Sequence, residues 1–232
     1  MSTNPTALDQ YLSAPPHWVV KKLKFVASVQ NSNVDKHIHD NEIPVSLCNY
    51  VDVYYNDRIT PELDFMQGSV SEPELEKFQL KKGQVILTKD SESWDDIGIP
   101  AYVSEDMPEV VCGYHLSLIK PNDIELDGSY LGWLAISDAL NDQFKLAANG
   151  VTRFGLPLYS ICNALILLPS VPEQQAIARF LDERMAKIDA FLAKVGVNKL
   201  KKDSLKGTLV DLTLEYRQAL ITSAVTGKIN VV

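Results

Sequence analysis

Apolar residues in the last quarter of the chain recur every three or four positions, which is the period of an amphipathic α-helix. From residue 177 to residue 195 the steps between them are 4, 4, 3, 4 and 3. The apolar positions are Ile177, Leu181, Met185, Ile188, Leu192 and Val195, followed by Leu205, Leu209, Leu212, Tyr216 and Leu220. This pattern predicts a long amphipathic helical region.

The predicted helix has a sharp beginning and one weak point. Ser170 stands three residues before Glu173, as in a capping box, and Pro172 falls in the first turn. Gly196 and its β-branched neighbours are poor helix formers, so a kink or a break is expected there. A continuous helix of about 50 residues would be about 75 Å long, more than one small domain covers. We therefore expect coiled-coil-like pairing with another helix, and packing on the chain's own domain is the alternative.

Residues 18–168 have a different hydrophobic pattern, in which short apolar runs are separated by turn residues. Such runs predict strands at residues 45–48, 51–55, 84–88, 101–103, 110–112, 116–119 and 164–168. Helical patterns cover residues 71–79 and 129–141. Because strands and helices do not alternate regularly, we predict an α+β fold with a mixed sheet. The chain then divides into a first domain, residues 1–168, and a helical region, residues 169–232.

Charge is distributed unevenly along the chain, whose net charge is −8. Residues 1–171 carry 12 Lys and Arg against 23 Asp and Glu, a net charge of −11, whereas residues 172–232 carry 10 against 7, a net charge of +3. A protein that binds DNA unaided usually presents a basic surface to the phosphates. The acidic first domain therefore predicts weak DNA affinity for the chain on its own.

No catalytic or metal-binding residue is predicted. His37 and His39 lie in a polar loop without a third ligand motif, and Cys112 with His115 matches no nucleophile signature. The sequence has neither a glycine-rich cofactor loop nor a phosphate-binding loop. Three isolated cysteines, with no membrane-spanning apolar run and no signal peptide, favour the reducing cytoplasm.

Several motifs carry a family resemblance. The helical region holds Leu-Pro-x-x-Pro-Glu-Gln-Gln-x-Ile-Ala from residue 168, Lys-Ile-Asp-Ala from residue 187, Tyr-Arg-Gln-Ala-Leu-Ile from residue 216 and Ala-Val-Thr-Gly-Lys-Ile from residue 224. Upstream, Pro-His-Trp at residues 16–18 and the blocks 88–92, 111–116 and 150–156 agree. Over nearly the whole chain, these motifs resemble specificity (S) subunits of Type I restriction–modification enzymes. Usual S subunits have two recognition domains and two conserved helical regions, whereas this chain has one of each and looks like a half-subunit.

The resemblance implies a non-catalytic subunit that gives the complex its DNA-sequence specificity, with residues 1–168 as target-recognition domain. The implied partners are double-stranded DNA, a second copy of the chain, methyltransferase (M) subunits and the motor–nuclease (R) subunit, with no membrane. No cofactor is expected here, because S-adenosylmethionine, ATP and Mg would be bound by partner subunits. The alternative is an acidic regulatory interaction protein or DNA mimic that occupies the methyltransferase subunits without reading sequence.

Candidates for reading DNA are polar and basic residues beside strand ends and glycines. Arg or Lys can form a bidentate contact with O6 and N7 of guanine, and His or Ser can read a single base edge. These candidates are Lys89, Ser91, Tyr114, His115, Thr152 and Arg153. Along the helical stripe, the predicted dimer interface consists of Ile177, Leu181, Ile188, Leu192, Leu212, Tyr216 and Leu220.

Overall fold

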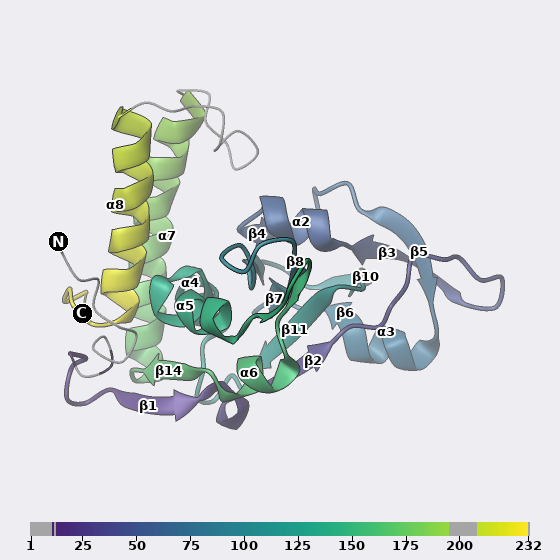
Figure 1. Cartoon of the computed structure of the whole chain (residues 1–232), viewed down its shortest axis with the longest axis horizontal. Coiled ribbons are helices and arrows are strands. Elements are labelled where there is room, and N and C mark those ends of the chain that lie inside the picture. Colours follow the sequence, from purple (N-terminus) through teal and green to yellow (C-terminus); the bar gives the residue numbers. More distant parts are fainter. Residues whose placement is uncertain (1–10, 12, 195–207, 232) are drawn as a thin grey trace.

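A five-stranded sheet built from the most buried apolar runs forms the middle of the molecule (Figure 1). In the computed structural model, which describes residue 11, residues 13–194 and residues 208–231, the strand order is β2-β11-β7-β9-β4. The strands are β2 (Ala27–Asn31), β11 (Leu116–Pro121), β7 (Val85–Thr88), β9 (Pro100–Val103) and β4 (Arg58–Ile59). Neighbours are antiparallel, except that β4 runs parallel to β9. The predicted strands at 84–88, 101–103 and 116–119 are confirmed.

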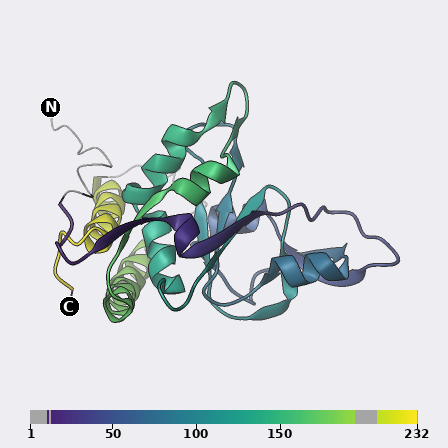
Figure 2. The ribbon, with the colours of Figure 1, turned by 90° about the horizontal axis from the view of Figure 1, so that it is seen from below.

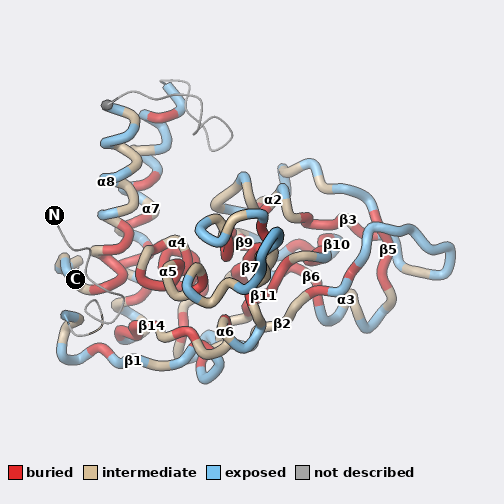
Figure 3. The backbone as a smooth tube through the Cα atoms, in the orientation of Figure 1, coloured by how far each residue is buried: buried red, intermediate tan, exposed pale blue. Residues whose placement is uncertain are grey.

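This sheet separates two hydrophobic cores. Successive side chains of a strand point to opposite faces, so Val85 and Leu87 enter the inner core, beside the helices, and Ile86 enters the outer core. Strands β7 and β9 are buried along their whole length (Figure 3). The sheet is therefore the middle layer of the molecule.

The outer core is closed by a second, four-stranded sheet in the order β5-β3-β10-β6. Its strands are β5 (Met66–Val70), β3 (Ile43–Cys48), β10 (Met107–Cys112) and β6 (Gln79–Leu80), with β3 and β10 parallel. Helix α3 (Glu72–Phe78) begins at a capping box between Ser71 and Glu74. The predicted helix at 71–79 and the predicted strands at 45–48 and 110–112 are confirmed. With these mixed sheets and its helices, the molecule has the predicted α+β fold.

The predicted strand at 51–55 is wrong, because these residues form helix α2 (Tyr50–Tyr55). Val51 and Val53 alternate with polar neighbours as in a strand, but Asn49 and Asp52 form a capping box ahead of them. The backbone N–H of Asn49 donates to Oδ2 of Asp52 at 2.7 Å. Capping of this kind satisfies N–H groups that would otherwise lack partners and so starts a helix. Val53 is buried and Val51 is exposed, as on opposite sides of a short helix.

The helical pattern at 129–141 is divided between α4 (Gly128–Ile136) and α5 (Asp138–Ala147). Ser137 separates them with extended backbone angles, φ −68° and ψ 150°. Its buried hydroxyl donates to the carbonyl oxygen of Leu134 at 2.6 Å. A serine hydroxyl that bonds the preceding turn competes with helix continuation, which explains why the apolar pattern continues through two helices.

The remaining elements surround the inner core. Strand β1 (Val19–Lys22) pairs with β14 (Leu165–Leu168), which confirms the predicted last strand. The other short elements are the 3-10 helix η1 (Leu23–Phe25), α6 (Leu158–Asn163), and the strands β8 (Asp90–Ser91), β12 (Asn149–Gly150) and β13 (Phe154–Gly155).

The C-terminal region is helical as predicted, and its described part consists of α7 (Val171–Lys194) and α8 (Thr208–Val225) lying side by side (Figures 1 and 2). Arg217 contacts Asp189, and Val225 lies near the strand that precedes α7, so the two helices are antiparallel. Helix α7 has 24 residues and is about 36 Å long. The stripe is therefore folded back on itself, and the expected kink at Gly196 lies outside the described residues. Among the helices described, none has the length and apolarity needed to cross a membrane.

Candidate nucleic-acid interface

Three segments far apart in the sequence meet at the end of β7. Strand β13 pairs with β8, so that Phe154 faces Ser91 and Gly155 faces Asp90. The N–H of Lys89 donates to the carbonyl oxygen of His115 at 3.1 Å, and the N–H of Leu156 donates to that of Lys89 at 2.7 Å. The fold thus brings the residues after β7, the turn before β11 and the β12–β13 hairpin together. All six predicted DNA-reading residues belong to these three segments.

Asp90 is the centre of a side-chain cluster made of Lys89, Asp90, Tyr114 and His115. Its Oδ2 lies 2.6 Å from Nδ1 of His115 and 3.8 Å from Nζ of Lys89. The Lys89 ammonium lies 5.0 Å from the centre of the Tyr114 ring, which in turn lies 4.0 Å from the His115 ring. His115 has φ 70°, an uncommon backbone conformation for a residue other than glycine. A carboxylate on Nδ1 leaves Nε2 as the ring atom available to a ligand.

The β12–β13 hairpin carries Thr152 and Arg153, both exposed. Gly150 at its base has φ 154°, and a Cβ there would lie 2.0 Å from the carbonyl oxygen of Arg153. The hairpin therefore requires glycine at this position, and it presents the Arg153 side chain to solvent.

Ser91 differs from the other five predicted residues, because its side chain is buried at 8% exposure. Its hydroxyl accepts the N–H of Ser93 at 3.2 Å and is hydrogen-bonded to Tyr50. Because Ser91 is enclosed in this structure, it is not presented to a ligand as the other five residues are, and base contact by Ser91 stays a prediction. Its contacts fit a role in holding Tyr50.

Sequence reasoning missed the aromatic group on α2. Tyr50 stacks on Tyr54 with ring centres 5.6 Å apart, and Tyr55 packs edge-on against Tyr54 at 5.0 Å. The hydroxyl of Tyr54 donates to Asp96 at 2.7 Å, and this bond raises the pKa of Tyr54. Trp94, in the loop after β8, is 52% exposed. The signal that could have revealed these tyrosines was the Asn49–Asp52 capping box, which puts Tyr50 and Tyr54 one turn apart.

The predicted dimer stripe is divided by the hairpin of α7 and α8. Ile177, Leu181 and Leu192 are buried within the chain, and Ile188 and Leu220 pack partly on the same core. Because α8 folds back on α7 and both pack on α4, these five side chains are not presented to a second copy in this structure. Leu212 and Tyr216 remain exposed, at 55% and 58%, together with Leu209 at 64%.

Metal ligands do not gather anywhere in the part of the chain that the structure describes: no group of three or more His, Cys, Asp or Glu could hold an ion. His37 lies 3.5 Å from Asp35, and its ring centre is 6.4 Å from that of His39, in an exposed loop. Cys112 is buried, and burial raises the pKa of its thiol to about 12.

Comparison with known proteins relates this chain to a known family. Residues 15–194 match the sequence model of the "Type I restriction modification DNA specificity domain". Among solved structures, one similar chain is described as "Crystal structure of HsdS subunit from Thermoanaerobacter tengcongensis", with 17% identity and a TM-score of 0.51 over 97% of this chain and 50% of that one. A search of curated proteins finds no match.

A second similar chain comes from a structure described as "Structural basis underlying complex assembly and conformational transition of the type I R-M system". The identity is 14% and the TM-score 0.56, over 93% of this chain and 47% of that one. At such identities the likeness shows a shared fold, and the chain spans about half the length of the solved chains it matches. Together with the family model, which covers more than half of the sequence, these findings show that the chain belongs to the family of Type I restriction–modification DNA specificity domains.

Proposed function

We propose that this chain is the non-catalytic half-subunit that gives a Type I restriction–modification system its DNA specificity. In this proposal it dimerises to read a bipartite target and docks methyltransferase subunits. The observation that carries the proposal is the meeting of Lys89, His115 and the Arg153 hairpin at the end of β7. Methyl transfer, ATP hydrolysis and cleavage belong to partner subunits in the cytoplasm, which bring S-adenosylmethionine, ATP and Mg.

Base reading is assigned to side chains with suitable donors and acceptors. Arg153 and Lys89 can donate to guanine O6 and N7, and His115 can use Nε2 toward a single base edge. Asp90, which neutralises positive charge in the cluster, disfavours a role confined to phosphate contact. Tyr114 and Thr152, both exposed, complete the proposed surface.

Affinity for the DNA backbone is expected to come mainly from partner subunits, because residues 1–171 carry a net charge of −11. The chain alone should bind DNA weakly at physiological salt, whereas its complex with methyltransferase subunits should bind tightly and select sequence. Fluorescence anisotropy with labelled duplexes, run for both forms, tests this division. Tight, specific binding by the chain alone would contradict it.

Dimerisation is assigned to the exposed stripe of α8. Leu209, Leu212 and Tyr216 follow each other at steps of three and four, so they share one helix face. Soluble monomers rarely leave such a patch open, and a two-fold pair would cover it with its own copy. Two copies would also bring two recognition domains together, as the proposed reading of a bipartite target requires.

Sedimentation of the purified chain tests the dimer. We expect a dimer at tens of micromolar and a monomer for the Leu212→Asp, Tyr216→Asp double variant. Leu146→Asp is the matched control, because Leu146 is also a highly exposed apolar side chain but belongs to α5 and not to the exposed stripe of α8. A wild-type monomer, or a dimer that survives the double variant, would contradict this interface.

The target of a symmetric dimer should be symmetric. Two identical recognition domains related by a two-fold axis read two identical inverted half-sites, separated by a nonspecific gap. Sequencing the methylated genome of a host in which this chain is the only specificity subunit should reveal an interrupted palindrome. An asymmetric motif would rule out the symmetric dimer.

The second candidate, an acidic interaction protein or DNA mimic, is favoured by one observation, the strong negative charge of residues 1–171. Such a protein would bind methyltransferase subunits equally well, so co-purification does not separate the two. Sequence-selective retention of DNA by the complex does, because a mimic would exclude DNA from the complex.

A further inference from the structure

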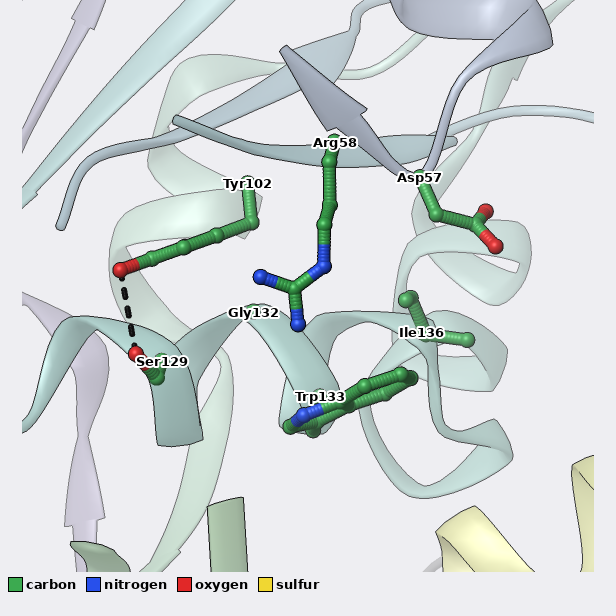
Figure 4. Close-up of a pocket in the computed structure, with 7 residues that line it drawn as sticks. All are labelled: Asp57, Arg58, Tyr102, Ser129, Gly132, Trp133 and Ile136. Atoms are coloured by element: carbon green, nitrogen blue, oxygen red, sulfur yellow. Dashed lines mark hydrogen bonds between the residues drawn. The ribbon is translucent and has the colours of Figure 1, made fainter. Parts of the chain in front are cut away.

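Arg58 lines a small pocket formed by residues of β4, β9 and α4 (Figure 4). Its guanidinium lies between two aromatic rings, 5.4 Å from the centre of Tyr102 and 5.8 Å from that of Trp133. Nη2 of Arg58 donates to Oδ1 of Asp182 on α7 at 2.5 Å. The indole Nε1 of Trp133 donates to the same oxygen at 2.8 Å. One carboxylate oxygen of α7 thus holds both an arginine from β4 and a tryptophan from α4.

The preceding residue makes the reciprocal contact with the other helix. Oδ2 of Asp57 accepts a hydrogen bond from Nη2 of Arg217 on α8 at 2.5 Å. The Nε of the same arginine lies 3.5 Å from Asp189 on α7. Two consecutive residues with opposite charges therefore bind the two antiparallel helices. We call Asp57, Arg58, Asp182 and Arg217 the clasp.

The clasp connects the edge of the five-stranded sheet to the α7–α8 hairpin. Arg58 lies on the edge strand β4 opposite Tyr102 of β9, so it is part of the five-stranded sheet. Helix α4 packs against β9, α7 and α8. At Gly132 of α4 a Cβ would lie 3.1 Å from the Cβ of Tyr102, so the helix and the sheet are in close contact there. Besides its packing on α4, the hairpin is bonded to α5 through Gln218 and Asp138 and to Trp18 through Glu173. The clasp adds the connection to the edge of the five-stranded sheet.

We propose that Arg58 is a positioning residue that fixes the angle between the recognition domain and the α7–α8 hairpin, and thereby the gap between the two half-sites. This inference rests on the proposed dimer, in which the hairpins join the two recognition domains. Duplex DNA advances about 3.4 Å per base pair, so a change of a few ångströms in the separation of the domains changes the preferred gap by one base pair. The half-sites themselves are read elsewhere, at the end of β7.

The chemistry of the contact calls for arginine. A planar guanidinium can stack between two rings and donate to a carboxylate at the same time, whereas the lysine ammonium is a compact point charge. Arg58→Lys therefore keeps the charge pair with Asp182 and loses the stacking that fixes direction. Arg58 and Asp182 are 41% and 42% exposed at their side chains, so these changes leave the cores intact.

The test uses the full chain in complex with its methyltransferase subunits, and reads the methylated motif by genome sequencing. Arg58→Lys, Arg58→Gln and Asp182→Asn should keep both half-sites and broaden the gap or shift it by at least one base pair. The exchanged pair Arg58→Asp, Asp182→Arg restores a charge pair without the stacking between Tyr102 and Trp133, so it should leave the gap as broad as Arg58→Lys does. Lys145→Gln, which removes an ion pair within α5, is the matched control and should keep the wild-type gap.

A spin-label distance gives a readout that does not depend on DNA. Spin labels at Lys82→Cys, in the turn before β7, and at Arg184→Cys, on α7, report the angle between the recognition domain and the α7–α8 hairpin. Both labels are introduced in a Cys162→Ser background, and the labelled chain is diluted with unlabelled chain. The wild type should give one narrow distance, and Arg58→Lys a broader one.

If a folded Arg58→Gln variant methylates half-sites separated by the wild-type gap, the proposal is overturned. This holds whatever spin-label distances the variant gives. If the wild-type complex instead yields no bipartite motif, the proposed function fails. The spin-label experiment then still decides whether Arg58 fixes the angle.

Discussion

Oδ2 of Asp90 lies 2.6 Å from Nδ1 of His115, in a turn where His115 adopts a left-handed backbone conformation. The two residues are 25 positions apart in the sequence and are joined through the backbone bond from Lys89 to His115. Asp90 thereby orients the imidazole and leaves Nε2 as the ring nitrogen that it does not contact.

Replacing Asp90 with Asn should relax one base position of the target. An amide no longer fixes which ring nitrogen of His115 carries the proton, so the edge offered to a base is less defined. We expect a loss of discrimination of about 1–3 kcal/mol at that position, the usual cost of one mismatched base pair. Competitive binding of the methyltransferase complex to a library of duplexes measures it. Unchanged preference at every position would mean that His115 does not read a base.

Replacing Arg153 with Ala separates base contact from phosphate contact. If Arg153 binds guanine, discrimination at one position falls by about 1–3 kcal/mol. If it binds phosphate, affinity falls equally for all sequences and the salt dependence becomes weaker. Lys82→Ala is the matched control, because Lys82 precedes β7 whereas the cluster lies beyond its other end. If Arg153→Ala changes neither the affinity nor the sequence selectivity, the β12–β13 hairpin does not contact DNA.

Replacing Leu181 with Ala should destabilise the fold, in contrast to a change on the exposed stripe. Leu181 is completely buried, so the substitution leaves a cavity that costs about 2–5 kcal/mol. Leu212, at 55% exposure, should tolerate Ala within about 0.5 kcal/mol in the monomer. Urea unfolding at low protein concentration, where the dimer dissociates, compares the two. Equal effects would show that α7 does not pack within its own chain as described.

The cysteines should differ in reactivity at pH 8. Burial raises the pKa of Cys112 to about 12 and that of Cys48 well above its usual value. Below these values the thiols stay protonated, and the thiolate is the form that reacts. Iodoacetamide followed by mass spectrometry should therefore modify only Cys162, which is partly exposed, until the protein is unfolded. Modification of Cys112 in the native protein would show that the outer core opens.

Local chemistry in the sequence determined much of the outcome. The helical pattern at 71–79, the short apolar runs around Val85 and Ile119, and the start of the C-terminal helical region at Ser170 and Glu173 were all legible, because each depends on neighbours within a few residues. The family motifs were equally local. At 51–55 the prediction followed the apolar run and overlooked the Asn49–Asp52 cap, which starts the helix.

Only the tertiary structure decided what these elements do together. The packing of α7 and α8 in the fold leaves Leu181 buried and Tyr216 exposed, although both occupy the same apolar period. The approach of Asp90 to His115, and of Arg58 to Asp182, joins residues 25 and 124 positions apart. Periodicity reports which face of a helix is apolar but not what covers it, and a side chain's partners depend on strand order and helix packing. For this reason the sequence suggested the candidate recognition residues singly, and the fold determined which of them lie together.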